Sequence, residues 1–195
     1  MAGGRLLDAV DARWFVSLDN GLAALHPLDG VELRPGFDVG TMHADRPDTQ
    51  AVHSDAAGAY HLSLLVSAYA LGAAEAARDL AAGHARTREQ FSRPIGAFQG
   101  VKHPVADMAV RCIMIRAQLT FAALALEAGE PDAAFHVAAV RRLAGQAAID
   151  NARTCIQVHG GMGMTDECDA HLPLKRAHAL AFIAPADREA LLAPA

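Results

Sequence analysis

The run "QGVKHPVADMAVRCIMIRAQLTFAALALEA" (residues 99–128) carries the clearest helical pattern in the chain. Its apolar residues recur three and four positions apart over the whole run: Val101, Val105, Met108, Cys112, Ile115, Leu119, Ala122 and Leu126. This spacing puts them on one face of an α-helix, where they form a seam for packing against other helices. Gly129 and Pro131 follow as stop signals. The run predicts one long helix with a single packing seam.

Similar patterns predict helices over about 58–87, 131–158 and 167–181, with a last helical turn after Pro185. Before them, "RWFVSL" (13–18) and "GVELRP" (30–35) are strand-like, and residues 41–58 are polar and read as a connection. We expect a mainly α fold: a four-helix bundle over 53–195, preceded by a short β-like segment and linker over 1–52. That segment is too small for a sheet of its own, so we expect it to pack on the bundle or on another chain.

Composition excludes several classes of function. The 195 residues carry a net charge of -5 without clusters of Lys and Arg, which argues against a nucleic-acid partner. The three cysteines lie far apart without metal-ligand spacing, so we expect no metal site and a reducing, cytoplasmic location. We read no signal peptide, and no apolar run that would predict a membrane span.

The segment "REQFSRPIGAFQ" (88–99) lies between two predicted helices and has two interpretations. It can be a simple connection, with its two phenylalanines plugging the end of the bundle. It can also bind a ligand, because Arg88 is a five-donor fork suited to phosphate and Gln99 both donates and accepts hydrogen bonds. The residues alone leave both interpretations open.

The segment "HGGMGMTDE" (159–167) is glycine-rich but follows a predicted helix. A dinucleotide fingerprint would follow a strand, so we reject a Rossmann fold. The glycines can serve as a helix stop. Their bare backbone can also let a flat or phosphorylated ligand come close.

Two longer stretches, "RTREQFSRPIGAFQGVKHPVADM" (86–108) and "QVHGGMGMTDECDAHLPLKRA" (157–177), resemble the C-terminal helical domain of the acyl-CoA dehydrogenase family. The resemblance covers roughly residues 58 to 180, and the strand-like start resembles the last strands of that family's middle β-domain. It implies FAD as cofactor and an acyl-CoA thioester as substrate. It also implies subunits whose loops reach the FAD of a neighbouring chain.

Carried over position by position, the resemblance implies that Arg88 contacts the FAD pyrophosphate. Phe91 would lie against the flavin end, and Gln99 near the adenosine portion.

The second motif would contribute Gln157 and Gly161 as further FAD contacts, with Gly160 allowing the close approach. These residues of both motifs would then contact an FAD molecule held by a partner chain.

The resemblance fails at the catalytic base, a glutamate that removes the α-proton of the substrate in the family. Its usual place falls on Ala184 here, and a second family location falls at Leu62 or Ser63, none of which can accept a proton. Asp187 and Glu189 lie close in sequence to the first location and are the remaining candidates in this chain.

Two further differences from the family concern size and one turn residue. The chain is about half a typical member and lacks most of the β-domain and the N-terminal helical domain. Ser92 also replaces a glycine of the family.

We therefore expect an acyl-CoA dehydrogenase-like subunit that contributes to FAD binding for α,β-dehydrogenation, in a homo- or hetero-oligomer with other subunits of this type. One alternative keeps catalysis in this chain, with Asp187 or Glu189 as the base. Another is a non-catalytic helical scaffold that assembles through the seam of residues 101–126. A third is a truncated fragment of a full acyl-CoA dehydrogenase.

Overall fold

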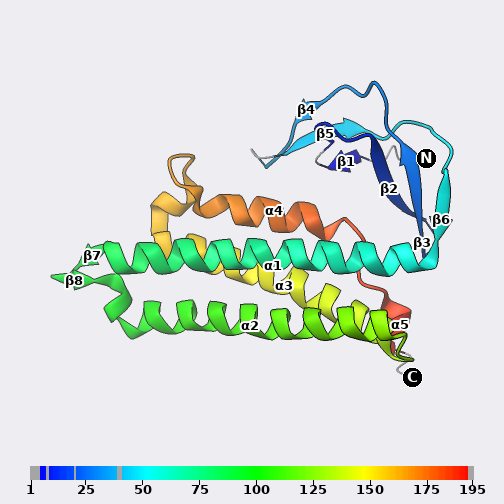
Figure 1. The fold of residues 1–195 in the computed structure, drawn as a ribbon. Coiled ribbons are helices and arrows are strands. Elements are labelled where there is room, and N and C mark those ends of the chain that lie inside the picture. Colours follow the sequence, from blue (N-terminus) through cyan, green and yellow to red (C-terminus); the bar gives the residue numbers. More distant parts are fainter. Residues whose placement is uncertain (1–4, 8, 20, 39–40, 193–195) are drawn as a thin grey trace. The chain divides into compact units, whose positions relative to one another are not determined.

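The computed structural model describes residues 5–7, 9–19, 21–38 and 41–192. Most of them form long helices, which confirms the predicted mainly α fold with a four-helix bundle (Figure 1). The chain divides into two compact units, Met1–Leu62 and Ser63–Ala195. The division comes later than the predicted one after residue 52. The reason is that the first turn of the first long helix packs with the strands: a side chain built at Gly58 would lie 3.0 Å from that of Ala23.

The elements of the first unit are short antiparallel strands. They are β1 (Arg5–Leu7), β2 (Trp14–Asp19), β3 (Leu22–Pro27), β4 (Arg34–Pro35), β5 (Met42–Asp45) and β6 (His53–Asp55).

The elements that follow are mostly helical. They are α1 (Ala56–Thr87), the hairpin strands β7 (Glu89–Gln90) and β8 (Arg93–Pro94), the 3₁₀ turn η1 (Ile95–Ala97), α2 (Gln99–Ala128), α3 (Ala133–His159), the 3₁₀ turns η2 (Gly160–Met164) and η3 (Asp169–His171), α4 (Leu172–Ala181) and α5 (Arg188–Leu192).

The first unit forms two three-stranded sheets, in the orders β1-β5-β4 and β2-β3-β6. It has a buried cluster of its own, made by Ala9, Phe15, Leu28 and Ala44. The expectation that this segment is too small for a sheet was therefore wrong. Strands β3, β5 and β6 were not predicted, because they are rich in alanine, histidine and polar residues instead of β-branched ones.

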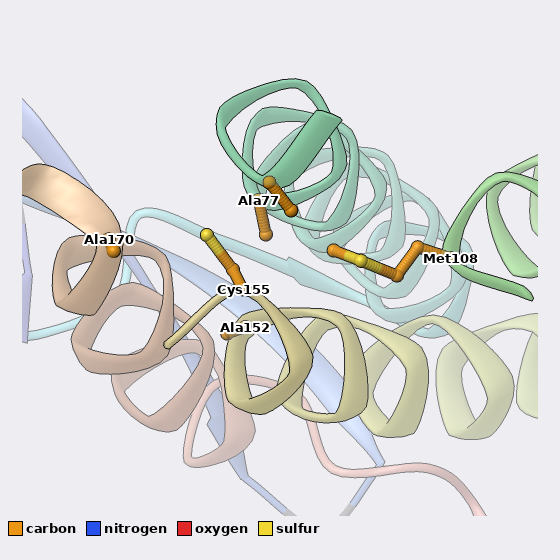
Figure 2. Close-up of a cluster of buried hydrophobic side chains, with 6 residues drawn as sticks. Ala77, Met108, Ala152, Cys155 and Ala170 are labelled. Carbon is orange, nitrogen blue, oxygen red and sulfur yellow. The ribbon is translucent and has the colours of Figure 1, made fainter. Parts of the chain in front are cut away.

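The bundle core is built mainly from alanine, which lets the helices approach closely. In α1 the buried residues include a stripe at three- and four-residue spacing: Ala70, Ala74, Ala77, Ala81 and Ala85. Figure 2 shows one core cluster, in which Ala77 of α1 and Met108 of α2 gather around Ala152 and Cys155 of α3, with Ala170 of η3. Helix α3 packs against both α2 and α4.

Helix α2 has the predicted bounds, and its predicted seam faces the bundle interior. Met108, Cys112, Ile115 and Ala122 are buried. The opposite face is also apolar, and its large side chains are exposed to solvent: Val110, Ile113, Met114, Phe121 and Leu124. The prediction of a single packing face was therefore incomplete.

By length and composition alone, α1 and α2 are each apolar enough to cross a membrane, which is weak evidence for a membrane span. The core helices of helical bundles share this composition, and both helices contribute buried residues to this bundle.

The predicted fourth helix is shorter than expected. It begins at Leu172, after the 3₁₀ turns η2 and η3, because Pro173 sets the backbone at the first helical turn and lacks an N–H group there. The predicted last turn after Pro185 is α5, Arg188–Leu192.

Candidate FAD-contacting site

The connection between α1 and α2 begins with a tight β-hairpin. Glu89 pairs with Pro94 and Gln90 with Arg93, which leaves a two-residue turn. The turn residues Phe91 and Ser92 both have positive φ, 54° and 63°. This is the backbone of the type I′ hairpin turn, which favours glycine or asparagine. Such a turn would suit the glycine that the family resemblance implies at the position of Ser92.

Arg88 is the residue at which α1 changes into this hairpin. Its N–H donates to the carbonyl of His84 at 2.8 Å, and its own carbonyl accepts from the N–H of Ile95 at 2.8 Å. The backbone of Arg88 is thus held from both sides while the residue is exposed. Within the described part of the chain, its guanidinium makes no hydrogen bond or ion pair, so its five donors are available to an anion.

The aromatic residues of the hairpin form a small exposed group. Phe91 is 87% exposed, and its ring meets that of Phe98 edge to face, with 6.0 Å between the centroids. The guanidinium of Arg93 lies 4.1 Å from the centroid of Phe98. Arg93 was not predicted to belong to this group. It lies five residues before Phe98, a spacing that carries no periodic signal, and only the hairpin brings the two side chains together.

Gln99 begins α2 close to this group. Its Oε1 accepts a hydrogen bond from Nε2–H of His103 at 2.6 Å. This bond orients the amide, because the oxygen is engaged and the NH₂ group is left to donate elsewhere.

The glycine motif ends α3. Gly160 has φ +64° and ψ −142°, a conformation open essentially to glycine, and its N–H donates to the carbonyl of Gln157. A Cβ added to Gly160 or Gly161 would meet no atom within 4 Å, so their bare backbone faces open space. A Cβ at Gly163 would lie 2.7 Å from the carbonyl oxygen of Ile156, so this glycine is required by packing.

The two motifs lie at the same end of the bundle. The rings of His84 on α1 and His159 on α3 stack with 4.2 Å between their centroids. Arg88 follows His84 by one helical turn, and His159 lies between Gln157 and the bare glycines. The structure thus places the two segments at the same end of the bundle. Neither histidine was predicted to contribute, since each lies singly in the sequence.

A pocket of about 310 Å³ lies beside the hairpin, between the end of α1 and the start of α2. It is lined by Ala82, Ala85, Arg86, Pro94, Gly96, Lys102 and Val105. Its volume is at the lower end of the roughly 300–1,000 Å³ of ligand pockets, so it is small for a dinucleotide.

Comparison with known proteins decides the family. Residues 58–184 match the family model described as acyl-CoA dehydrogenase, C-terminal domain. The chain belongs to the acyl-CoA dehydrogenase family. The matched range covers both motifs and all of α2 and α3, which confirms the resemblance read from the sequence.

The curated relatives include mycobacterial acyl-CoA dehydrogenases. The chain is 38% identical over 144 residues to the acyl-CoA dehydrogenase IpdE2 of Mycobacterium tuberculosis, covering 74% of this chain and 43% of that protein. It is 43% identical over 117 residues to the acyl-CoA dehydrogenase FadE34 of the same organism, covering 60% of this chain and 16% of that protein.

Solved structures agree on the fold. The ChsE4-ChsE5 complex from Mycobacterium tuberculosis matches with a TM-score of 0.70 and 26% identity, over 92% of this chain and 54% of that chain. Butyryl-CoA dehydrogenase from Megasphaera elsdenii matches with a TM-score of 0.73 and 20% identity, over 97% of this chain and 58% of that chain. The chain thus spans about half the length of these acyl-CoA dehydrogenases, or less.

The described residues fit an FAD contact on chemical grounds. The unengaged guanidinium of Arg88 suits a pyrophosphate, and the oriented amide of Gln99 suits a nucleoside. The open backbone of Gly160 and Gly161 gives a flat or phosphorylated group room to approach.

The position expected for the family's base carries no carboxylate. Ala184 is buried and has φ 44°, and its carbonyl accepts from Nε–H of Arg141 at 2.7 Å. Asp187 is exposed, and its Oδ1 caps α5 by accepting from the N–H groups of Glu189 and Ala190, at 2.9 and 3.2 Å. The second family location, Leu62 or Ser63, lies half-buried within α1 and bears no acid either.

Metal binding has no support in the described residues, where no group of three or more His, Cys, Asp or Glu side chains is placed to hold an ion.

Proposed function

We propose that this chain is a subunit of an acyl-CoA dehydrogenase oligomer and contributes the Arg88 hairpin and the glycine loop to an FAD held chiefly by a partner subunit. The observation that supports it best is the His84–His159 stack, which holds the two cofactor motifs of the family at one end of the bundle. An assembly of two different subunits has a precedent in the related ChsE4-ChsE5 complex.

The reaction proposed for the oligomer is the α,β-dehydrogenation of an acyl-CoA thioester. The substrate loses a proton from its α-carbon to a base and a hydride from its β-carbon, and a double bond forms between these carbons. Bound FAD supplies the hydride acceptor. Each residue of this chain has a supporting part: Arg88 neutralises phosphate charge, Gln99 donates to the nucleoside, and the glycines admit the cofactor.

The proton acceptor is assigned to the partner subunit. A base must lie within hydrogen-bond reach of the proton that it removes and must be held there. The buried methyl group of Ala184 cannot accept a proton, and Asp187 already accepts two backbone N–H groups as a helix cap. This chain therefore helps to hold the cofactor, and the chemistry at the α-carbon belongs to the partner.

The experiment is co-expression with a complete acyl-CoA dehydrogenase subunit encoded beside this chain, followed by absorbance between about 350 and 500 nm, where bound flavin absorbs. The wild-type complex is expected to carry flavin. Arg88→Ala is expected to weaken FAD binding about 10- to 100-fold, the range for a charge-assisted hydrogen bond. Arg142→Ala is the matched control, since Arg142 is an exposed arginine within α3 that belongs to neither motif. A complex that carries no flavin would falsify the proposal, as would equal losses in the two variants.

A non-catalytic scaffold is the second candidate, and the exposed apolar face of α2 favours it. Ile113 and Leu124 are 67% and 59% exposed in the single chain, so this face is available for assembly. The predicted seam is already buried inside the bundle, so the scaffold hypothesis now rests on the opposite face. A complex of unchanged mass without flavin in every variant would favour the scaffold.

A further inference from the structure

The stacked histidines join two segments that are far apart in sequence. His84 is near the end of α1, and His159 is the last residue of α3. Their rings are nearly parallel, with 25° between planes and 4.2 Å between centroids. Stacked flat rings of this kind stabilise the contact beyond the area that they bury.

His159 has a defined tautomer and orientation. Its Nδ1–H donates to the carbonyl of Cys155 at 2.8 Å, one helical turn earlier. A carbonyl only accepts, so the proton lies on Nδ1 and the ring is held against α3. The next residue is Gly160, where the backbone leaves the helix with positive φ. A displacement of the His159 ring is thus transmitted directly to the glycine loop.

His84 has the same relation to the first motif. Its carbonyl accepts the N–H of Arg88, so the last turn of α1 connects the His84 ring rigidly to the Arg88 backbone. Each ring of the stack therefore lies within one turn of a proposed FAD contact.

We propose that His84 and His159 form a clasp that sets the spacing between Arg88 and the bare backbone of Gly160 and Gly161. Both are positioning residues, and they act through the residues that would touch the cofactor. The part of this inference that concerns FAD rests on the proposed function, whereas the clasp itself is a property of the bundle.

The clasp requires uncharged rings. Burial lowers the pKa of His84, and the nearby His159 and Arg88 lower it further. The charged and titratable groups that influence His84 are Arg88, directly after α1, and His159 of α3. The Cys155 thiol lies beside His159 and stays neutral, because burial raises its pKa to about 12. A histidine whose pKa is lowered by folding stabilises the fold fully above the unfolded pKa of about 6.5, and this contribution is lost as pH falls.

The test is hydrogen exchange at the amides of residues 161–163 in the full 195-residue chain, at about pH 7.5 and about pH 5.5, corrected for intrinsic rates. His84→Ala removes the stack and is expected to raise exchange about 2- to 10-fold at both pH values. His84→Phe keeps a flat ring without a charge, so it is expected to restore protection at both pH values. The wild type is expected to lose protection only at the lower pH.

His178→Ala is the matched control, because His178 is an exposed histidine of α4, and it is expected to change nothing. Unchanged exchange in His84→Ala would overturn the clasp. Equal pH dependence in the wild type and His84→Phe would overturn the requirement for neutral rings.

Flavin retention in the co-purified complex separates this inference from the proposed function. If no form of the complex carries flavin but loop protection follows His84, the proposed function fails and the clasp stands. If the complex carries flavin and His84→Ala retains it as well as His84→Phe does, the positioning role toward the cofactor is wrong.

Discussion

The side-chain amide of Asn151 on α3 donates a hydrogen bond to the carbonyl of Ala74 on α1 at 3.1 Å. The same NH₂ group lies 3.2 Å from the carbonyl of Met108 on α2, and its Oδ1 accepts from Nη1–H of Arg111 at 3.2 Å. Asn151 is fully buried, so one side chain connects three helices inside an otherwise alanine-rich core.

Asn151→Ala is expected to lower the free energy of unfolding by about 2–3 kcal/mol, because buried hydrogen bonds are lost and a small cavity is left. Urea unfolding followed by circular dichroism measures the change. Gln146→Ala on the exposed side of α3 is the control, expected to stay within about 0.5 kcal/mol. Equal effects of the two substitutions would contradict the role given to Asn151.

Arg141 holds the end of α4 in a similar way. It is buried, and its guanidinium donates to the carbonyls of Leu180, Ile183 and Ala184 at 2.7, 2.8 and 2.7 Å. Arg141→Met keeps an apolar side chain but leaves these carbonyls without their donor, so a loss of about 3 kcal/mol or more is expected in chemical denaturation.

The neighbouring Arg142→Met, at an exposed position of α3, serves as the control for Arg141. A loss below about 1 kcal/mol in Arg141→Met would show that water replaces the guanidinium at these carbonyls.

Ser92→Gly is expected to stabilise the fold by about 1 kcal/mol, because Ser92 has φ 63° and a left-handed backbone costs a non-glycine residue about that much. Thermal unfolding measures the gain. Ser92→Ala removes the hydroxyl and keeps the Cβ, so no gain is expected from it. If Ser92→Ala raises the stability as much as Ser92→Gly, the serine hydroxyl, and not the left-handed backbone, is the destabilising group.

Asp187→Asn and Glu189→Gln are expected to leave acyl-CoA-dependent bleaching of the flavin in the complex within about twofold of wild type, because the base is assigned to the partner. Asparagine still caps a helix, so Asp187→Asn should not disturb α5. Stopped-flow absorbance measures the rate. A loss of about 100-fold or more in either variant would assign the base to this chain.

Cys168 is expected to be the thiol that reacts first in the native protein. Cys112 and Cys155 are buried, and burial raises the pKa of both thiols, that of Cys155 to about 12, whereas Cys168 is only half-buried. We propose a titration with a disulfide reagent near pH 8, where about one quarter of an ordinary thiol with a pKa of about 8.5 is ionised. It should show one fast thiol and two slow ones. Cys168→Ser should remove the fast phase, and a fast phase that persists would contradict the burial of the other two.

The outcome for the helices shows what local pattern can predict. Helix α2 has the predicted bounds because its apolar spacing and Gly129, at φ 68°, are local signals. Both motifs that carry the family resemblance were also recognisable, since each is a continuous run of residues. The placement of both motifs at one end of the bundle is visible only in the structure, through the His84–His159 stack.

The strands of the first unit show the limit. Strand β3, Leu22–Pro27, contains few residues that favour strands, and it exists because it pairs with β2 and β6. The sequence did not indicate this pairing, since strand pairing depends on a partner and not on the segment alone.

By itself, the amino-acid sequence determined the long helices, their ends and the family of the chain, because periodicity, turn residues and motifs are properties of neighbouring positions. Tertiary structure alone decided that Asn151 reaches Ala74 across 77 positions, that Arg141 binds the end of α4, and that two lone histidines stack. Such contacts depend on how the helices pack in space, and packing joins residues whose separation in the chain carries no local signal.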